Sequence, residues 1–206
     1  MEAHDFSRSL QLEHSGFDAQ NGFYRTVLKA ERISRADYGS SSGKKLQQSD
    51  IDVILKVGGK ELKVSEKRRE TDYGDLLLEF YSKFPDSPGW LDCSEADCLA
   101  YFVPGKVYLV DMVKLRRFYH DILKPAVPLS VFSRLVGMYP QGSARKDIRI
   151  NAGGRPTEVT AVQAYNCMND GSGQWYTESI CIRFDVLRDF GVTVRTFDLQ
   201  GGCPID

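Results

Sequence analysis

The sequence has few histidines and no paired cysteine motif, and these shortages exclude several kinds of site. Its three histidines are scattered and lie in no recognisable motif, which argues against a histidine-based hydrolase or nuclease. The five cysteines are an odd number without Cys-x-x-Cys spacing. A structural zinc site is therefore not expected.

Long apolar runs and an excess of charge of one sign are lacking as well. No run approaches the roughly 20 apolar residues that span a bilayer, and the N-terminal residues lack the basic and apolar regions of a signal peptide. We therefore expect a cytoplasmic protein without membrane contact. The net charge is −1, so any attraction to a polyanion has to come from local basic clusters.

Length and composition predict one soluble globular domain. The 206 residues suit one core, since cores stop growing at roughly 250 residues. The hydrophobic and charged fractions are ordinary, which excludes a disordered or fibrous chain. We expect one α/β (α+β) domain over residues 1–206, with an arm at 1–16 and a C-terminal extension at 125–206 that completes the sheet.

Periodicity and turn residues predict the remaining elements. Apolar residues at helical spacing predict a helix over 17–33, and Gly and Ser predict a loop over 36–48. The run at 76–81 fits a strand or a buried helix, and we favour the strand. Further strands are expected at 99–103, 106–110, 175–184 and 192–199, helices at 112–123 and after Pro128, a helical turn at 185–190, and irregular connections around short strands such as 147–151 over 141–173.

Residues 50–69 have the pattern of a β-hairpin closed by two glycines. Acidic and apolar residues alternate before Gly58 and Gly59, which supply the positive φ of a two-residue turn. Residues whose numbers sum to 117 then face each other, so Asp52 opposes Ser65 and Asp50 opposes Lys67. The polar face is expected to carry Asp50, Asp52, Lys63, Ser65 and Lys67, and Glu66 shares the other face with the apolar residues.

Basic side chains gather in two places. The second hairpin strand carries Lys63, Arg68 and Arg69, and the helix at 112–123 carries Arg116 and Arg117. All five are candidates for phosphate contacts. A solvated surface would have the same pattern.

Five fragments in serial order resemble the PD-(D/E)XK nuclease superfamily, and within it uncharacterised phage and prophage proteins. They lie at 50–52, 65–68, 72–79, 88–90 and 97–102, inside a similarity that covers about residues 17–124. The resemblance implies a restriction-endonuclease-like fold, in which helices flank a central mixed β-sheet. It also implies metal-dependent hydrolysis of DNA phosphodiester bonds.

The resemblance assigns roles to the hairpin and exposes one departure. Asp52 corresponds to the first metal-ligating carboxylate, and Lys67 to the lysine of the acid-x-Lys element. Ser65 stands where the family has its second acid, and a neutral hydroxyl is a poor ligand for Mg²⁺ or Mn²⁺. The metal would neutralise charge on the phosphoryl oxygens and supply the attacking hydroxide.

Three substitutes for the missing carboxylate are open. Glu66 ranks first, Glu79 is offered by the next strand, and Glu61 with Lys63 forms a second acid-x-Lys element. The catalytic set is then Asp52, Glu66, Lys67 and Glu79, with Asp52, Glu66 and Glu79 as metal ligands. Without a substitute, the site is inactive and Asp52 and Lys67 form only an ordinary surface pair.

Three functions follow from these observations, so enzymatic activity is left open. The first is a metal-dependent phage-type DNA endonuclease, which by analogy acts as a homodimer. The second is a catalytically inactive module of the same fold that binds nucleic acid or a partner protein, for example in phage–host conflict. The third is a soluble interaction protein of other ancestry.

Overall fold

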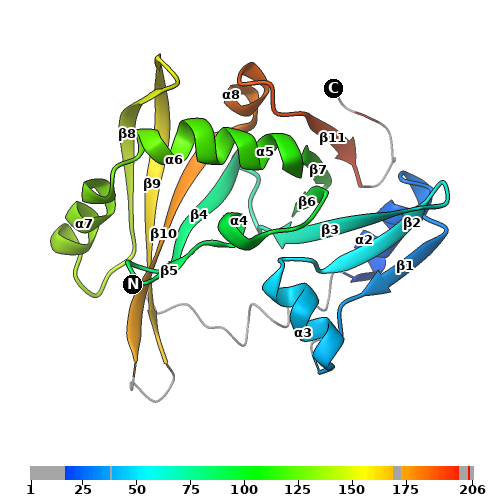
Figure 1. Cartoon of the computed structure of the whole chain (residues 1–206). Helices are drawn as coiled ribbons and strands as arrows, with labels where there is room; N and C mark the ends of the chain where they lie inside the picture. Colours follow the sequence, from blue (N-terminus) through cyan, green and yellow to red (C-terminus); the bar gives the residue numbers. More distant parts are fainter. Residues whose placement is uncertain (1–16, 38, 169–172, 200–203, 205–206) are drawn as a thin grey trace. The chain divides into compact units, whose positions relative to one another are not determined.

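The computed structural model describes residues 17–37, 39–168, 173–199 and 204, and the predicted arm at 1–16 lies outside them. The described chain is an α+β protein with two β-sheets (Figure 1). The described residues divide into a six-stranded unit (17–37, 39–73, 93–115, 191–199 and 204) and a five-stranded unit (74–92, 116–168 and 173–190). The expectation that the two units form a single domain stays a prediction.

The six-stranded sheet is mixed. Its strands β3 and β6 are parallel, and its other neighbouring strands are antiparallel. The predicted strands at 99–103, 106–110 and 192–199 are confirmed within it. In spatial order the strands are β1 (Arg32–Arg35), β2 (Val53–Val57), β3 (Lys60–Arg68), β6 (Cys98–Val103), β7 (Lys106–Asp111) and β11 (Val194–Asp198).

Helix α2 (Phe17–Thr26) covers one face of this sheet (Figure 1). Phe23 and Tyr24 of the helix are buried against the apolar face of the β2–β3 hairpin, which includes Val53 and Val64. The Phe23 ring also meets Phe102 of β6 edge to face, with 6.1 Å between the ring centroids. The period-2 pattern of the hairpin therefore supplies the inner surface of a core that the helix closes.

The first helix is shorter than the apolar spacing predicts. The Ala30 N–H donates to the carbonyl of Tyr24 at 2.9 Å, and Lys29 adopts a φ of +55°, which is a left-handed closure of the helix end. The chain then continues as β1, where Ile33 lies opposite Leu55. Ile33, which belonged to the apolar pattern of the predicted helix, therefore lies in a strand.

Residues 41–48, which the prediction assigned to a loop, form helix α3 (Ser41–Gln48). The Ser40 hydroxyl accepts the Gly43 N–H at 3.0 Å and caps the first turn. Gly43 is also required by packing, since a Cβ there would lie 1.7 Å from the carbonyl oxygen of Asp37. The Ser and Gly residues that indicated a loop are thus the capping and packing residues of a helix.

The five-stranded sheet is antiparallel throughout. The strands predicted at 76–81 and 175–184 are confirmed as its two adjacent strands β4 and β10. In spatial order the strands are β5 (Ser87–Pro88), β4 (Asp75–Lys83), β10 (Gln174–Arg183), β9 (Arg155–Cys167) and β8 (Ala144–Ala152).

The prediction of irregular connections over 141–173 is wrong for most of that range. Strands β8 and β9 form a long hairpin closed by Gly153 and Gly154, whose φ values are +55° and +83°. Ala152 lies opposite Arg155 directly beside this turn. The same Gly-Gly signal that indicates the first hairpin therefore marks the second.

Helices pack on one face of the five-stranded sheet. The Phe80 ring of β4 lies 5.1 Å from the Tyr119 ring and 5.5 Å from the Phe132 ring, measured between centroids. Within the described residues, no helix is long and apolar enough to span a bilayer. The remaining helices are α4 (Trp90–Cys93), α5 (Met112–Phe118), the π-helix η1 (Tyr119–Leu123), α6 (Lys124–Ala126), α7 (Leu129–Met138) and α8 (Phe184–Asp189).

The helix predicted over 112–123 does not stop before Pro125. The Lys124 N–H donates to the carbonyl of Tyr119, five residues earlier, which is the wide turn of a π-helix. Pro125 then lies in the first turn of α6, directly after this wide turn. The helix predicted after Pro128 is confirmed as α7.

Candidate functional site

The β2–β3 hairpin has the register that its Gly-Gly turn predicts. Val53 lies opposite Val64, and Leu55 lies opposite Leu62. Gly58 and Gly59 have φ values of +56° and +76°, as a two-residue turn of this kind requires. The predicted pairing of the two strands is therefore confirmed from Val53 to the turn.

Lys67 and Asp50, which the predicted register places opposite each other, form an ion pair beyond the end of the β2–β3 ladder. The Lys67 Nζ lies 2.6 Å from Oδ1 of Asp50. Asp50 is 8 % exposed and has a φ of +52°, so its carboxylate is turned inward at the end of the hairpin. Its second oxygen, Oδ2, is buried without a hydrogen-bond partner. The lysine of the acid-x-Lys element is thus already engaged by a carboxylate.

Asp52 closes the end of the hairpin ladder. Its backbone N–H donates to the Val64 carbonyl at 3.0 Å, and its Oδ2 accepts the backbone N–H of Glu66 at 2.6 Å. A carboxylate that accepts a backbone N–H forms a strong, charge-assisted hydrogen bond. Asp52 therefore has a structural role, because it holds the backbone of β3. This role is independent of metal binding.

Glu66 lies on the face of the hairpin that α2 covers. Arg35 donates to both of its carboxylate oxygens, at 2.7 Å to Oε2 and 3.2 Å to Oε1. The Tyr24 hydroxyl donates to Oε1 at 2.6 Å, and burial together with this carboxylate raises the pKa of Tyr24 well above its usual value. The Glu66 side chain is only 8 % exposed. Its acceptor sites are largely used within the fold.

Arg35 is itself held by the first helix. Its guanidinium donates to Gln20 Oε1 at 3.2 Å and to Asn21 Oδ1 at 3.0 Å, and it stacks 4.1 Å from the centroid of the Phe17 ring. These contacts fix the planar fork in front of Glu66. The pair therefore belongs to a connected network between α2, β1 and β3.

Ser65 occupies the position at which the family has its second acid. It is completely buried, and its Oγ has no hydrogen-bond partner. Among the residues that the structure describes, no three His, Cys, Asp or Glu side chains are grouped to hold a metal ion. A centre that combines Asp52 and Glu66 would require Glu66 to leave Arg35 and Tyr24, so the present arrangement does not fit Mg²⁺ or Mn²⁺ at these two residues.

Glu79 lies in β4 opposite Ser179 of β10, which settles the strand over the helix for this segment. It belongs to the five-stranded unit, whereas Asp52, Glu66 and Lys67 belong to the six-stranded unit. A metal site that unites them stays a prediction. Packing requires a glycine at the nearby position 89, because a Cβ at Gly89 would lie 1.9 Å from the Glu79 carbonyl oxygen.

The alternative acid-x-Lys element lies nearer the turn. Glu61 is exposed and opposite Lys56, and the Lys63 ammonium lies 3.9 Å from Glu95. The Lys63 backbone N–H donates to Oδ2 of Asp97 at 2.9 Å. Lys63 therefore takes part in a surface pair of the kind that contributes about 0 to 1 kcal/mol.

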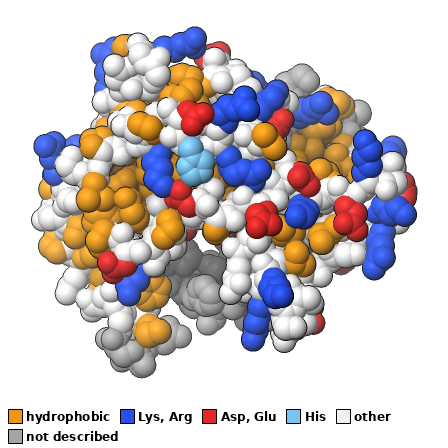
Figure 2. Space-filling model, in the orientation of Figure 1, with side chains coloured by type: hydrophobic (Ala, Val, Ile, Leu, Met, Phe, Trp, Pro, Cys, Tyr) orange, Lys and Arg blue, Asp and Glu red, His pale blue; other side chains and the backbone are white. Residues whose placement is uncertain are grey.

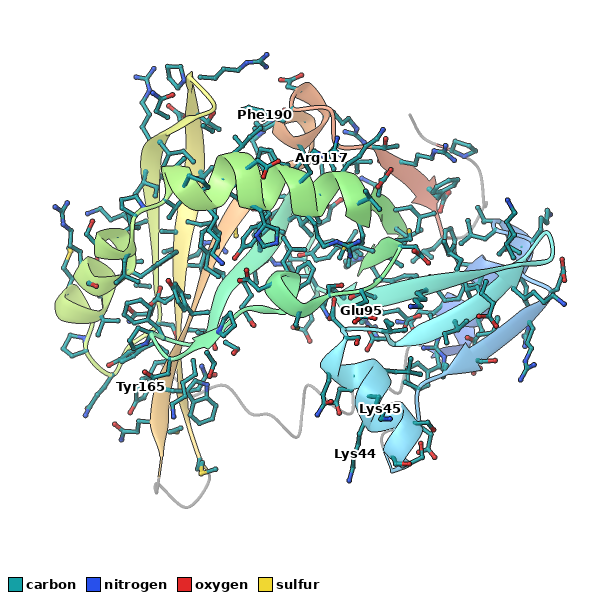
Figure 3. The ribbon with its side chains drawn as sticks, viewed as in Figure 1. Lys44, Lys45, Glu95, Arg117, Tyr165 and Phe190 are labelled. Atoms are coloured by element: carbon teal, nitrogen blue, oxygen red, sulfur yellow. The ribbon has the colours of Figure 1, made fainter. Side chains whose placement is uncertain are left out.

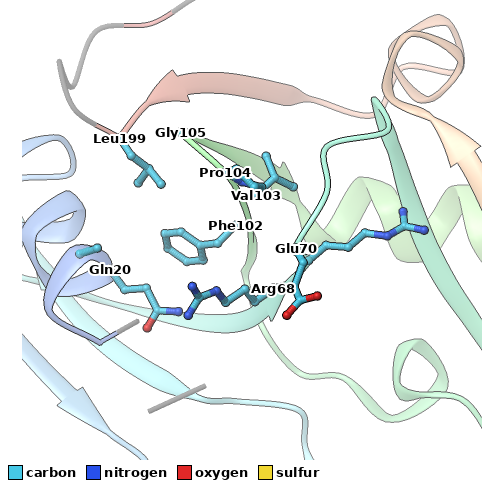
Figure 4. A pocket seen from close by; sticks show the side chains of 10 residues that line it. Gln20, Arg68, Glu70, Phe102, Val103, Pro104, Gly105 and Leu199 are labelled. Carbon is cyan, nitrogen blue, oxygen red and sulfur yellow. The ribbon is translucent and has the colours of Figure 1, made fainter. Parts of the chain in front are cut away.

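Arg68 and Arg69 line a cavity of about 410 Å³ in the six-stranded unit (Figure 4). Gln20 of α2 and Phe102 of β6 lie on its wall. The Arg69 backbone N–H donates to the Phe102 carbonyl at 2.9 Å, and its guanidinium stacks 4.6 Å from the Tyr73 ring centroid. Two consecutive arginines, which directly follow the ion-paired Glu66 and Lys67 in sequence, thus line a cavity.

Arg116 and Arg117, the predicted phosphate-binding residues of the second basic cluster, are not among the residues that line this cavity. Arg117 is exposed on α5, and its neighbour Arg116 is half-buried. Figure 2 shows Lys and Arg side chains interspersed with Asp and Glu side chains on the visible face, in agreement with the net charge of −1. Contacts of Arg116 and Arg117 with nucleic acid stay a prediction.

A second polar cluster, in the five-stranded unit, surrounds Asp92. Tyr119 donates to Oδ2 at 3.1 Å, Lys124 donates to Oδ1 at 2.6 Å, and His120 Nδ1 lies 3.8 Å from Oδ1. The π-helix places Tyr119 and Lys124, five residues apart, on one side of the helix. Burial and Asp92 together raise the pKa of Tyr119, so the phenol stays protonated and anchors the helix.

Sequence reasoning did not find the partners of Glu66. Arg35 lies in β1, whose first two residues fall in the helix predicted over 17–33, and Tyr24 has the pattern of an ordinary helix residue. The only available signal was Glu66 itself, a charged residue on the apolar face of the hairpin, since a charge buried there requires partners. No family model, curated protein or solved structure matches the chain.

Proposed function

We propose that this chain binds nucleic acid through its phosphate groups without hydrolysing it. The observation that carries the proposal is the position of Arg68 and Arg69, which line a cavity directly after the internally paired Glu66 and Lys67. Guanidinium groups bind phosphate oxygens through charge-assisted, often bidentate hydrogen bonds. A local pair of this kind supplies the attraction that a net charge of −1 cannot.

The absence of hydrolysis in this proposal rests on the engagement of the carboxylates. Phosphodiester hydrolysis by a nuclease of this type needs carboxylates that are free to hold a metal ion. Glu66 would first have to leave Arg35 and Tyr24, and uncoupling one partner of a buried ion pair costs about 3 to 5 kcal/mol. Ser65 offers no charge in its place.

A restriction-endonuclease-like fold is part of the same proposal. The six-stranded unit has a helix, a β-hairpin and a parallel neighbouring strand in the order that the resemblance implies. Its sheet is mixed, and α2 lies on one face. By this likeness DNA is the first ligand to test, and a homodimer is the first assembly to test.

Metal-dependent DNA cleavage is the second candidate, and one observation favours it. Oδ2 of Asp50, two residues before Asp52, is buried without a hydrogen-bond partner. An acceptor in that state has lost its hydration without compensation, and a cation would satisfy it. In this candidate Asp50 takes the place that the sequence offers to Glu66.

Cleavage and binding assays on the same substrates separate the two candidates. Labelled single-stranded DNA, duplex DNA and RNA are incubated with the protein in Mg²⁺ or Mn²⁺, and the wild type is compared with Asp52→Ala and Lys67→Ala. Non-hydrolytic binding predicts a mobility shift with intact substrate for all three proteins. Cleavage by the wild type that is lost in a folded Asp52→Ala variant would instead establish the nuclease.

A further inference from the structure

The cavity beside Arg68 and Arg69 has the size of a small-ligand site. Its volume of about 410 Å³ falls in the range of roughly 300 to 1,000 Å³ that such sites have. The wall is formed entirely by residues of the six-stranded unit. The lining residues are Ala19, Gln20, Arg68, Arg69, Glu70, Phe102, Val103, Pro104, Gly105 and Leu199.

One side of the cavity presents hydrogen-bond donors. The Gln20 side chain is 5 % exposed, and its Oε1 already accepts from Arg35. Its amide nitrogen is therefore turned toward the Arg68 guanidinium, as Figure 4 shows. Arg side chains carry donors only. Gln20 and Arg68 together form a donor surface for an anion.

The other side of the cavity is apolar. The Phe102 ring and the Leu199 side chain face the Gln20 and Arg68 side chains across it (Figure 4). Leu199 is held there because its backbone N–H donates to the Gly105 carbonyl at 3.0 Å. A ligand that fills this side needs an apolar body, and inorganic phosphate alone would leave it empty.

An acceptor completes the wall. Glu70 follows the two arginines, is exposed, and lines the same cavity. A carboxylate at a nucleotide site accepts hydrogen bonds from sugar hydroxyls, and it also disfavours a second anionic group beside it.

The loop that carries these side chains is fixed at both ends. Arg69 is bonded to Phe102 through its backbone, and Asp72 accepts from the Tyr108 hydroxyl at 3.0 Å and from the Lys106 ammonium at 3.3 Å. Residues 69 to 72 are thereby anchored on β6 and β7. Such preorganisation lowers the entropy lost when a ligand binds.

We propose that this cavity binds a nucleoside monophosphate group, with the phosphate at Gln20 and Arg68 and the base against Phe102 and Leu199. The group is either a free nucleotide or the terminal nucleotide of a strand, and the choice of a nucleotide rests on the proposed function. The cavity thus recognises a nucleotide as a whole, which a continuous phosphate backbone contact would not require.

Calorimetric titrations with adenosine monophosphate, adenosine and inorganic phosphate test the composite site. Adenosine monophosphate is expected to bind more tightly than either part. Arg68→Gln and Gln20→Leu are each expected to weaken it about 10-fold or more, because a hydrogen bond to a charged group contributes roughly 1.5 to 3 kcal/mol. The control Lys44→Ala/Lys45→Ala, on exposed residues of α3, should bind like the wild type.

Oligonucleotides with and without a terminal phosphate distinguish the two sources and separate this inference from the proposed function. Tighter binding of the phosphorylated strand, lost in Arg68→Gln, supports the terminal nucleotide. Binding of adenosine monophosphate without binding of either strand supports the free nucleotide and overturns the proposed function. Equal binding of both strands without binding of adenosine monophosphate overturns the inference and leaves the proposed function standing.

Discussion

Arg35 donates to both carboxylate oxygens of Glu66, at 2.7 Å and 3.2 Å, in a pair whose side chains are 20 % and 8 % exposed. The pair ties β1 to β3 and stands beneath α2, whose Tyr24 donates to the same carboxylate. This relationship explains why Glu66 lies on the otherwise apolar face of the hairpin. It also bears on the functional interpretation, because Glu66, the first-ranked substitute for the missing metal ligand, would have to leave these partners to bind a metal ion.

Arg35→Ala is expected to destabilise the six-stranded unit by about 3 kcal/mol or more, because it leaves the Glu66 charge buried without its partner. Tyr24→Phe should cost less, about 1.5 kcal/mol, since it removes one hydrogen bond to a charged group. Urea denaturation followed by circular dichroism measures both changes. Arg35→Ala removes two hydrogen bonds and a charge from Glu66, whereas Tyr24→Phe removes one hydrogen bond, so the order of their effects is the informative result.

Lys56→Ala provides the matched control for Arg35→Ala. Lys56 pairs with Glu31 at 4.0 Å, and both side chains are about half exposed, so its loss should cost no more than about 1 kcal/mol. If Arg35→Ala is no more destabilising than Lys56→Ala, the Glu66 pair is not buried in solution and the carboxylate is available for other ligands.

The first hairpin could be predicted because its turn chemistry and its alternation agree. Gly58 and Gly59 set the register, and the Asp50–Lys67 pair at 2.6 Å follows from it. The second hairpin has the same Gly-Gly turn, at Gly153 and Gly154, but polar residues flank it and concealed the alternation. In both hairpins the Gly-Gly turn marks where the strands pair, whereas the alternation of residue types indicated the pairing only in the first.

Gly59→Ala is expected to destabilise the six-stranded unit by about 1 kcal/mol or more, because a side chain disfavours its φ of +76°. Gly22→Ala is the matched control in the same unit. Gly22 lies within α2, and a Cβ there would meet nothing within 4 Å, so alanine should stabilise by roughly 0.5 to 1 kcal/mol. Equal effects of the two variants in denaturation experiments would contradict the turn geometry.

Glu178 is expected to make the five-stranded unit less stable as the pH rises. It is completely buried on β10, neither of its carboxylate oxygens has a hydrogen-bond partner, and burial raises its pKa to about 8. Between about pH 4.5 and pH 8 the folded state keeps a proton that the unfolded chain has lost, so the free energy of unfolding falls. The full shift corresponds to a loss on the order of 5 kcal/mol.

Glu178→Gln should remove most of this pH dependence and raise the stability at about pH 8, since the amide is neutral throughout. Glu158→Gln, the same change at an exposed position of β9, should leave the dependence unchanged. Urea denaturation across this pH range measures the slopes. A wild type whose stability does not fall between about pH 5 and pH 8 would show that Glu178 finds a partner in solution.

The candidate site could be predicted only in part, for a physical reason. Register follows from local rules, so Asp52, Lys67 and the faces of the hairpin were accessible from the sequence. The partner of Glu66 comes from Arg35 on β1, and the cavity beside Arg68 is completed by Gln20 and Leu199 from distant segments. Contacts between residues far apart in sequence depend on packing, which periodicity does not encode.

The salt dependence of oligonucleotide binding tests the central claim most directly. Fluorescence anisotropy is measured at several salt concentrations for the wild type, Arg68→Ala/Arg69→Ala and the control Lys44→Ala/Lys45→Ala, whose residues lie on α3 (Figure 3). We predict that the wild type binds intact substrate with an affinity that falls as salt rises. The arginine variant should bind more weakly, with a slope of log affinity against log salt that is smaller by about 1.5, and the control should match the wild type. Salt-independent binding, or the same slope in the arginine variant as in the wild type, would contradict the account.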